Sequence, residues 1–388
     1  MGLFYRLSLL KSQFLIYNVL MQKILSIFGT RPEAIKMAPL VKELKQRKGI
    51  KSVVCITAQH RDMLDQVLKI FKIKPDYDLN MMKPGQTLSD ITTKAIKGIE
   101  EVIIKEKPDL VLVHGDTTTA MSGALAALYQ QTKVGHVEAG LRTRDKYSPF
   151  PEEINRQIID QIADYLFAPT RKSRKNLGKK HNKDQKIFIT GNTAIDALKT
   201  TVSDKYHHPI FDWIGEDKMI LLTAHRRENL GAPMRRIFKA IKKITEEFDN
   251  VKVVYPVHLN PKVQEVAKEV FGDSDKVKLI EPLDVFDFHN FMKKAYIILS
   301  DSGGIQEEAP SLGIPVLVLR DTSERPEGVR AGTLKLVGTS TKKVYTATKK
   351  LLNNKYSYRR MAKAKNPYGD GHASQYIVDH ILEQEKSI

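Results

Sequence analysis

The amino-acid sequence predicts an α/β protein made of two doubly wound, Rossmann-like domains that face a central cleft. Short apolar segments alternate with amphipathic segments of helical periodicity, a pattern typical of parallel strands joined by helical crossovers. The alternation breaks off in the polar stretch 200–218 and then begins again, and 388 residues exceed one typical core. We therefore expect domains over 22–195 and 196–368, and a helical segment over 369–388 that can pack back on the first domain.

The expected strands and helices follow one another in the order that this architecture requires. In the first domain the strands are short β-branched runs, at 23–28, 51–57, 109–114, 133–137, 165–168 and 186–190. Its helices carry an apolar stripe, at 33–47, 61–71, 88–107 and 152–162, with a further helix-like segment between the strands at 109–114 and 133–137. The second domain repeats the pattern, with strands at 218–223, 251–256, 277–280, 296–300, 315–319 and 333–337. Its later helices are expected at 305–312, 342–352 and 356–364, and a last one at 375–384.

Composition excludes several classes of protein. An apolar fraction of 41% and a charged fraction of 28% are typical of a soluble globular protein. The single cysteine, Cys55, rules out a disulfide framework and a cysteine zinc cluster, and fits a reducing, cytoplasmic location. Since Cys55 lies in the apolar run 52–57, we interpret it as a core residue.

The charge and the first residues give no sign of a nucleic-acid or membrane partner. The net charge of +18 is dispersed over the chain, without the aromatic-interleaved basic patch of an RNA-binding module. We interpret it as solvated basic faces. The leader 1–21 is apolar but broken by Arg6 and Lys11, so it has no run of membrane-spanning length and is expected to lie outside the fold.

Two acidic residues, Asp116 and Glu138, mark a provisional active site. The strands expected at 109–114 and 133–137 end in Gly115-Asp116 and in Glu138, which is 22 residues after Asp116. That spacing fits one helical crossover and a returning neighbouring parallel strand. Both carboxylates would then lie at the carboxyl ends of adjacent strands, where open α/β sheets bind ligands.

Two glycine-containing turns are candidates for anion binding. The first strand ends in Gly29-Thr30-Arg31, with Lys36 one turn into the next helix, and the helix start would offer free N–H groups. In the second domain Asp301-Ser302-Gly303-Gly304 opens a helix in which Glu307 and Glu308 can accept from sugar hydroxyls. The alternatives are a tight turn with solvated cations and an ordinary helix cap. The GxGxxG dinucleotide fingerprint does not occur.

Three further charged clusters also follow expected strands or the acid-bearing stretch. They are 225–229 (HRREN), 320–325 (RDTSER) and 149–156 (PFPEEINR). Each alone is explained by solvated surface charge. Together they would line the face on which the two domains meet.

Several long motifs, taken in order, resemble one family. They are GTRPEAIKMAPL (29–40), TAQHRDMLDQVL (57–68), VHGDTTT (113–119), HVEAGLRT (136–143), SPFPEEINR (148–156), ITGNTAIDAL (189–198), HRREN (225–229), PVHLNP (256–261), DSGGIQEEAPSLG (301–313), RDTSERPE (320–327) and NPYGDG (366–371). Over about residues 22–380 the chain is similar to the bacterial non-hydrolysing UDP-N-acetylglucosamine 2-epimerases.

This resemblance implies a fold like that of the two-domain GT-B glycosyltransferases, a homodimer and no cofactor or metal. It implies interconversion of UDP-N-acetylglucosamine and UDP-N-acetylmannosamine for cell-surface polysaccharide synthesis. Because C2–H is not activated by a carbonyl, the family's route is elimination of UDP to 2-acetamidoglucal and re-addition. Such a route needs acid–base groups near C2 and a firm hold on the diphosphate.

The resemblance also implies roles for individual residues. Asp116, Glu138 and Glu152 match carboxylates that transfer protons, and His225 matches a histidine needed at the nucleotide. The implied substrate-binding residues are Arg31, Lys36, Phe288 (uracil), Ser302, Gly303, Gly304, Glu308 (ribose) and Arg325.

Members of the family can carry an activating second UDP-N-acetylglucosamine site. Its implied lining residues here are Gln59, Arg61, Glu152, Arg226 and His258. The sequence departs from many relatives at Gly85, where they have arginine, and from some at Leu283, where they have glutamine near the uracil. Weaker activation and a backbone contact to the uracil are the corresponding expectations.

Three other functions compete with this hypothesis. A hydrolysing relative would release free N-acetylmannosamine and UDP, and the resemblance over nearly the whole chain argues against it. A UDP-sugar glycosyltransferase of the same architecture would need an acceptor groove. A nucleic-acid-binding protein that uses the +18 charge would bind DNA or RNA with a steep salt dependence.

Overall fold

The structure is a computed structural model that describes residues 22–58, 61–83, 85–178, 184–272, 274–323 and 325–385. The leader expected at 1–21 lies outside these residues. The described chain forms two compact units. Unit 1 comprises the described residues up to Thr190 together with those from Ser374 onward, and unit 2 comprises Gly191–Ala373.

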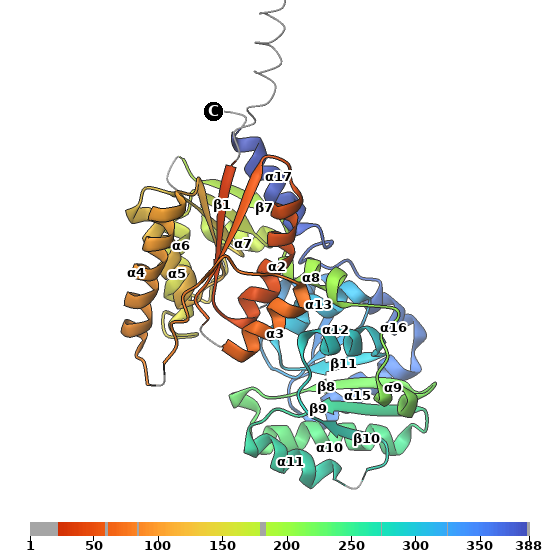
Figure 1. Cartoon of the computed structure of the whole chain (residues 1–388). Coiled ribbons are helices and arrows are strands. Elements are labelled where there is room, and N and C mark those ends of the chain that lie inside the picture. Colours follow the sequence, from red (N-terminus) through yellow and green to blue (C-terminus); the bar gives the residue numbers. More distant parts are fainter. Residues whose placement is uncertain are drawn as a thin grey trace, which may run out of the picture. The chain divides into compact units, whose positions relative to one another are not determined.

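Unit 1 contains a parallel seven-stranded sheet of order β3-β2-β1-β4-β5-β6-β7 (Figure 1). Its strands are β1 (Gln22–Phe28), β2 (Ile50–Ile56), β3 (Tyr77–Asp78), β4 (Leu110–His114), β5 (Lys133–Val137), β6 (Tyr165–Ala168) and β7 (Lys186–Ile189). The central strands are mostly apolar and largely buried, as in β1, where every residue from Ile24 to Phe28 is buried. Such continuous runs arise because helices cover both faces of a parallel sheet.

The helices of unit 1 form a layer on each face of this sheet. They are α2 (Arg31–Gln46), α3 (Arg61–Phe71), α4 (Leu88–Glu106), α5 (Thr118–Tyr129), α6 (Glu152–Ile162), α7 (Arg171–Leu177) and α17 (Ala373–Glu385). Helices α4, α5 and α6 pack side by side on one face, while α2 and α17 lie on the other (Figure 1). An ion pair between Arg47 and Asp379 and a stacked contact between Phe188 and His380 hold α17 within unit 1.

Unit 2 has the same construction around a parallel six-stranded sheet of order β10-β9-β8-β11-β12-β13. Its strands are β8 (Lys218–Thr223), β9 (Val251–Pro256), β10 (Val277–Ile280), β11 (Ile297–Ser300), β12 (Val316–Val318) and β13 (Leu334–Leu336). Its helical segments are α8 (Thr193–Thr201), α9 (Pro209–Ile214), η1 (Arg227–Asn229), α10 (Ala232–Glu247), α11 (Pro261–Phe271), α12 (Val285–Lys294), α13 (Gly303–Glu308), η2 (Ala309–Leu312), α14 (Pro326–Ala331), α15 (Thr341–Asn353) and α16 (Lys355–Ala362). The prediction of two doubly wound domains is confirmed.

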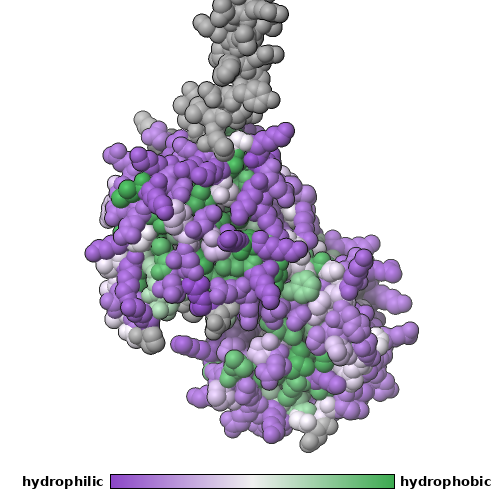
Figure 2. Space-filling view, viewed as in Figure 1, coloured by the Kyte–Doolittle hydropathy of each residue, from purple (hydrophilic) through white to green (hydrophobic). Residues whose placement is uncertain are grey.

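The core of each unit lies between the sheet and these helix layers. In α10 the buried residues Met234, Ile237, Phe238, Ile241 and Ile244 recur at helical spacing, so one stripe faces the sheet. Hydrophilic residues cover most of the visible face of both units (Figure 2). In the described ranges, none of the helices combines the length and the apolar character that spanning a bilayer requires.

Cys55 is a core residue, as predicted. It is fully buried in β2, and burial raises the pKa of its thiol to about 12. The thiol is therefore neutral at physiological pH, which does not suit a nucleophile.

In both units the strand order reverses direction in the middle of the sheet. Strand β1 pairs with β2 on one side and β4 on the other, and β8 pairs in the same way with β9 and β11. Such a switch point leaves a crevice at the carboxyl ends of the two central strands, which is where doubly wound sheets bind ligands. The segments that begin at Gly29, Gly115, Ala224 and Asp301 leave the sheets at these points.

The structure differs from the sequence-based elements in short segments. The stretch 200–218, predicted to be irregular, contains α9, in which Ile210 and Ile214 are buried and His208 caps the first turn. A helix of six residues is too short to show a period, which explains the error. Strand β3 and helices α7 and α14 were not predicted for the same reason.

Candidate active site

The turn after β1 brings two loops of unit 1 into contact. A side chain at Gly29 would place its Cβ 1.9 Å from Thr57 Oγ1 and 2.8 Å from Thr119 Oγ1, so only glycine fits. Those two threonine hydroxyls are hydrogen-bonded to each other over 2.9 Å. The turn that carries Arg31 is thus packed directly on the start of α5, close to Asp116.

The carboxylate of Glu33 accepts hydrogen bonds from the donors of this turn. Its Oε2 accepts from the N–H groups of Gly29 and Thr30, over 3.1 and 2.8 Å. Its Oε1 accepts from the hydroxyl of Thr117, over 2.7 Å. The expectation that this helix start offers free N–H groups to an anion is therefore wrong for these two positions. An anion here would depend on the half-buried side chain of Arg31.

Glu138 is held in a buried cluster at the end of β5. Its Oε2 contacts the ammonium group of Lys36 and lies 3.0 Å from His114 Nε2. Lys36 comes from α2 and His114 is the last residue of β4, so three neighbouring elements meet at one carboxylate. Glu138 also has a φ of +70°, a left-handed conformation that is unusual for a non-glycine residue. Strained residues of this kind are frequent at functional sites.

The charges around Glu138 decide its ionisation. Burial alone would raise its pKa, but Lys36 and His114 outweigh burial and hold the pKa well below its ordinary value of 4.5. A depressed folded-state pKa means that the cluster stabilises the fold above the unfolded-state pKa and loses this contribution as the pH falls through the folded-state pKa. Glu138 is therefore a carboxylate at neutral pH.

This arrangement predicts the pH dependence of a Lys36→Met variant. Without the ammonium group, burial dominates and the pKa of Glu138 rises, so the acid limb of kcat/KM should move to higher pH. Lys23→Met is a matched control, because Lys23 pairs with Glu106 at the amino ends of the strands, whereas Glu138 follows the carboxyl end of β5. The control should leave the acid limb in place, and an unmoved limb in Lys36→Met would contradict the assignment.

Two side chains of α6 bind Asp116. Its Oδ2 lies 2.5 Å from a guanidinium nitrogen of Arg156, and its carbonyl oxygen accepts from Asn155 Nδ2 over 2.9 Å. Since β4 and β5 are paired in register, Asp116 and Glu138 follow adjacent strand ends, as predicted. Glu152 begins α6, and its Oε2 is buried without a hydrogen-bond partner among the described residues. Asp116 and Glu138 thus each lie beside a cation in unit 1, and carboxylates can take part in proton transfer.

In unit 2 the buried carboxylate of Asp301 organises the segment after β8. It accepts from the backbone N–H groups of His225, over 3.0 and 3.2 Å, and of Arg226, over 3.0 Å. It also accepts from Asn229 Nδ2 over 2.9 Å. Asp301 follows β11, which neighbours β8, so the two strand ends are joined at the switch point. The consequence is a fixed position for the His225 ring.

His225 stacks on His258, with ring centroids 5.4 Å apart and an angle of 10° between the planes. Burial lowers the pKa of His225, and the nearby His258 and Arg226 lower it further, whereas Asp301 acts in the opposite direction. The ring is therefore mostly neutral at pH 7. Arg226 has a buried Nε with no hydrogen-bond partner in the described part of the chain. His225 lies beside Arg226 and His258, two of the residues implied for a second site.

Ser302 is the N-cap of α13, which begins at Gly303, two residues before the predicted helix start. The Ser302 hydroxyl makes no capping bond. A Cβ at Gly303 would lie 2.7 to 3.0 Å from the guanidinium group of Arg325, so glycine lets this guanidinium pack on the turn. Arg325 Nε donates to Glu307 over 2.7 Å, and Asn192 Nδ2 donates to the other oxygen of Glu307 over 2.8 Å.

Glu307 and Glu308 were both expected to accept hydrogen bonds from sugar hydroxyls, but the structure places them in different environments. Glu307 is buried and bound to Arg325, so it is not available to a sugar, and that part of the expectation is wrong. Glu308 is half-buried, with His289 Nε2 3.5 Å from its carboxylate. Phe288 and Leu283 pack against the core of unit 2 as half-buried residues.

The remaining residues implied for a second site lie in unit 1. Gln59 lies outside the described residues. Arg61 donates to both oxygens of Asp78, over 2.7 and 2.9 Å, and to Asn80 over 3.0 Å, so β3 anchors much of its guanidinium group. Gly85 lies in an exposed turn with a φ of +77°.

Several partners that complete the site were not assigned from the sequence. They are Glu33, His114, Asn155, Arg156 and Asp301. The sequence contains one signal for Arg156, which follows Glu152 by one helical turn and therefore shares its face of α6. Within the described ranges no three His, Cys, Asp or Glu side chains are grouped in a way that could hold a metal ion.

Comparison with known proteins identifies the family. Residues 42–382 match the family model described as UDP-N-acetylglucosamine 2-epimerase. The chain is 64% identical, over 360 residues, to the UDP-N-acetylglucosamine 2-epimerase of Bacillus subtilis, covering 93% of this chain and 95% of the relative.

Solved structures agree with this match. A putative UDP-N-acetylglucosamine 2-epimerase from Listeria monocytogenes superposes with a TM-score of 0.91 at 55% identity, covering 94% of this chain and 97% of that one. The UDP-GlcNAc 2-epimerase of Neisseria meningitidis, solved with UDP-GlcNAc bound, gives a TM-score of 0.83 at 49% identity, covering 93% of this chain and all of that one. With one family model and relatives of this identity spanning nearly its whole length, the chain belongs to the UDP-N-acetylglucosamine 2-epimerase family of isomerases.

Proposed function

We propose that this epimerase inverts C2 of UDP-N-acetylglucosamine by eliminating UDP and adding it back. In the first step a carboxylate removes the C2 proton, the C1–C2 double bond forms, and the C1–O bond breaks with its electron pair going to the diphosphate. The intermediate is 2-acetamidoglucal. In the second step a proton is delivered to the opposite face of C2 while a diphosphate oxygen forms the bond to C1, which gives UDP-N-acetylmannosamine.

The observation that carries this proposal is the pair Asp116 and Glu138 on adjacent strand ends of unit 1. Each has a cation beside it, Arg156 for Asp116 and Lys36 for Glu138. Two carboxylates can serve the two faces of one carbon, as bases and, once protonated, as acids. Glu152, whose buried Oε2 has no hydrogen-bond partner in the part of the chain that the structure describes, completes the proton-transferring set.

Unit 2 would supply the hold on the leaving group. Arg325 is fixed by Glu307 and packs on the Gly303 turn, where the backbone of Ser302 and Gly304 can also approach a phosphate. Glu308 would accept from the ribose hydroxyls and Phe288 would border the uracil. From unit 1, Arg31 would add charge for the phosphates. Positive charge at the diphosphate stabilises the negative charge that develops as the C1–O bond breaks.

The depressed pKa of His225 predicts how UDP binding depends on pH. The diphosphate would favour the imidazolium form, so binding should raise the pKa of His225 and take up a proton. UDP affinity should therefore rise as the pH falls from 8 to 6. Because UDP itself titrates in this range, the measurement is the difference in pH dependence between wild type and His225→Asn, by titration calorimetry. Identical dependences in the two proteins would refute the role of His225.

We infer that the product supplies cell-surface polysaccharide synthesis and that the enzyme works as a cytoplasmic homodimer. An activating substrate site would involve Gln59, Arg61, Glu152, Arg226 and His258, with weak activation because Gly85 supplies no cation. The stacking of His258 on His225 supports a link between activating and catalytic sites.

Incubation with UDP-N-acetylglucosamine alone, followed by NMR of the products, tests the reaction. The expected product is UDP-N-acetylmannosamine, in equilibrium with the substrate and without any acceptor. Free N-acetylmannosamine with UDP would indicate a hydrolysing enzyme instead. No reaction until a sugar acceptor is added would favour the glycosyltransferase alternative.

A further inference from the structure

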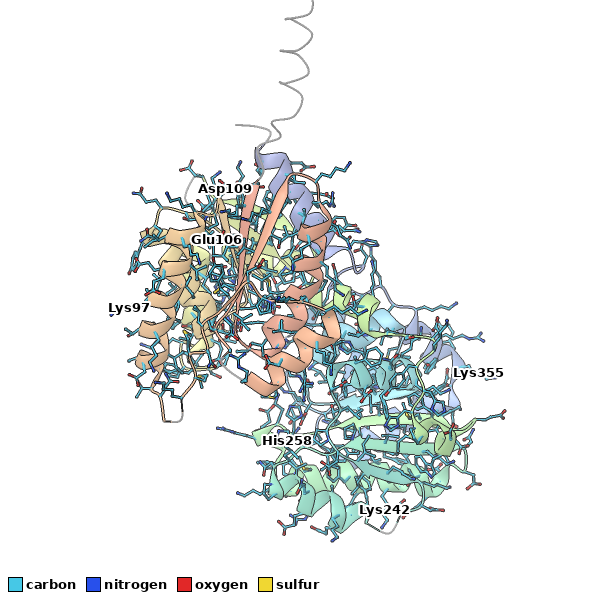
Figure 3. The ribbon with its side chains drawn as sticks, in the orientation of Figure 1. Lys97, Glu106, Asp109, Lys242, His258 and Lys355 are labelled. Atoms are coloured by element: carbon cyan, nitrogen blue, oxygen red, sulfur yellow. The ribbon has the colours of Figure 1, made fainter. Side chains whose placement is uncertain are left out.

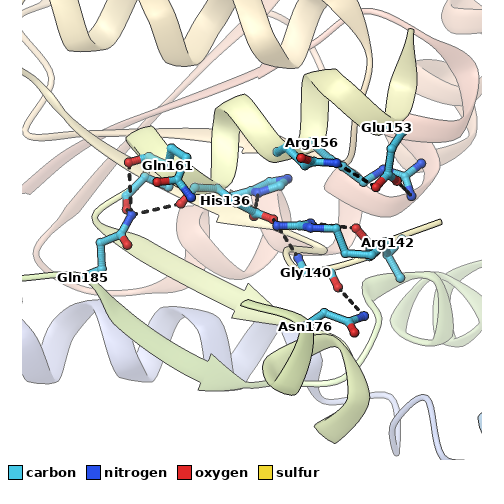
Figure 4. A network of polar contacts seen from close by, with 12 residues as sticks. His136, Gly140, Arg142, Glu153, Arg156, Gln161, Asn176 and Gln185 are labelled. Carbon is cyan, nitrogen blue, oxygen red and sulfur yellow. Dashed lines mark hydrogen bonds and ion pairs between the residues drawn. The ribbon is translucent and has the colours of Figure 1, made fainter. Parts of the chain in front are cut away.

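A buried network in unit 1 connects the loops that carry Asp116 and Glu138. His136, in β5, is fully buried, with Nδ1 2.6 Å from Asp160 Oδ1 and Nε2 2.7 Å from the carbonyl oxygen of Gly115 (Figure 4). A carbonyl oxygen can only accept, so Nε2 carries a hydrogen and donates to it. The peptide oxygen immediately before Asp116 is therefore fixed by a side chain from the neighbouring strand.

The other oxygen of Asp160 holds the loop that follows Glu138. Asp160 Oδ2 accepts from the N–H of Gly140 over 3.3 Å and lies 2.6 Å from a guanidinium nitrogen of Arg142. Asn176 Nδ2 donates to the carbonyl oxygen of Gly140 over 3.0 Å. One buried carboxylate is thus connected, through His136 on one side and Gly140 on the other, to both acid-bearing loops.

Helix α6 provides the rigid support for this arrangement. Asp160 lies one turn after Arg156 and Asn155, which hold the side chain and the carbonyl oxygen of Asp116. Near the start of the same helix, Glu153 accepts from the backbone N–H groups of Thr143 and Arg144, which lie in the loop between Glu138 and α6. A network anchored on one helix fixes the spacing of two carboxylates better than two separate loops would.

We propose that His136 and Asp160 are positioning residues that set the separation of the two proton-carrying carboxylates, Asp116 and Glu138. Neither residue touches the sugar. The inference rests on the proposed function, because only a reaction that uses both carboxylates on one carbon makes their separation matter. A displacement of about 1 Å in such a geometry can reduce the rate on the order of 10²-fold.

Two substitutions of His136 provide matched variants, since each retains one of the two ring hydrogen bonds. In His136→Asn the side-chain amide lies near the position of His136 Nδ1 and keeps the hydrogen bond with Asp160. In His136→Gln the amide lies near the position of Nε2 and keeps the hydrogen bond donated to the carbonyl oxygen of Gly115. His136→Asn should lower kcat by about 10²-fold, and His136→Gln by less than about tenfold. UDP affinity should stay within roughly twofold of wild type in both, because the proposed UDP-holding residues of unit 2 are untouched.

Gln185→Ala is a control for the general stability of α6. Gln185 Nε2 donates to the carbonyl oxygens of Asp160, Gln161 and Ala163, over 3.0, 3.3 and 2.8 Å (Figure 4). The substitution removes three bonds to this helix without touching either loop. It should lower the melting temperature and leave kcat close to that of wild type.

The outcomes separate this inference from the proposed function. Equal losses of kcat in His136→Asn and His136→Gln, or a near-normal kcat in His136→Asn, would overturn the positioning role. If His136→Asn does not fold, Asp160→Asn decides, since an amide has one acceptor where Asp160 has two. It should lower kcat by about tenfold or more at unchanged UDP affinity, and wild-type turnover would overturn the role. Failure of the wild-type enzyme to form UDP-N-acetylmannosamine would instead refute the proposed function.

Discussion

Replacing Glu138 by glutamine should lower kcat by about 10²- to 10⁴-fold, the range that general acid–base groups contribute. The amide keeps the shape of the side chain but cannot accept a proton at the pH of the reaction. It also leaves the ammonium group of Lys36 without its carboxylate, so the melting temperature should fall as well. UDP affinity should change little, because the residues proposed to hold UDP, apart from Arg31 and Lys36, lie in unit 2.

Glu106→Gln is the matched control for this experiment. Glu106 is also a carboxylate of unit 1 paired with a lysine, Lys23 at 3.1 Å, and it accepts from the hydroxyl of Tyr77 over 2.6 Å. It ends α4, just before Asp109 and the amino end of β4 (Figure 3). Glu138 instead follows the carboxyl end of β5, so the two carboxylates lie at opposite ends of the parallel strands. Its replacement should cost stability but not turnover. Near-normal kcat in Glu138→Gln, or an equal loss in the control, would remove Glu138 from the proton-transferring set.

Arg325→Ala should weaken UDP binding by roughly 10- to 150-fold, which corresponds to the loss of a hydrogen bond to a charged group. The guanidinium group is held by Glu307 and packs on Gly303, so it is already in place before a ligand arrives. Its removal also leaves the buried Glu307 carboxylate without its cation. Calorimetric titration with UDP measures the affinity directly.

Arg235→Ala separates this binding effect from the loss of an Arg–Glu pair as such. Arg235, in α10 of unit 2, forms a bidentate pair with Glu269 over 2.7 to 3.0 Å, but both side chains are solvent-exposed. UDP affinity should be unchanged in this variant. An Arg325→Ala protein that binds UDP as tightly as wild type would contradict the assignment of Arg325 to the nucleotide.

The alternation of strands and helices was predictable from the sequence because long periodic segments dominate this fold. Expected strands such as 218–223 and 133–137 coincide with β8 and β5 residue for residue. The position of Asp116 and Glu138 after neighbouring strands also followed from their spacing, because a right-handed crossover leaves few alternatives. Short segments such as α9 were not predictable, since a single turn of helix has no period to detect.

The partners of the site residues could not be derived from the sequence. Lys36 and Glu138 are 102 residues apart, and only the folded sheet brings their charges together. The sequence likewise suggested free N–H groups after β1, whereas Glu33 folds back and accepts from two of them. Glu307 and Glu308 are adjacent and chemically identical, yet the fold buries one against Arg325 and leaves the other available. Such differences depend on tertiary contacts, which composition and periodicity do not encode.

The most direct test of the account is the epimerisation of UDP-N-acetylglucosamine in heavy water, followed by NMR at C2. If carboxylates of unit 1 remove the proton from one face of C2 and deliver another to the opposite face, the UDP-N-acetylmannosamine formed must carry deuterium at C2. UDP-N-acetylmannosamine that forms at a normal rate with protium at C2 would contradict proton transfer, and with it the elimination of UDP.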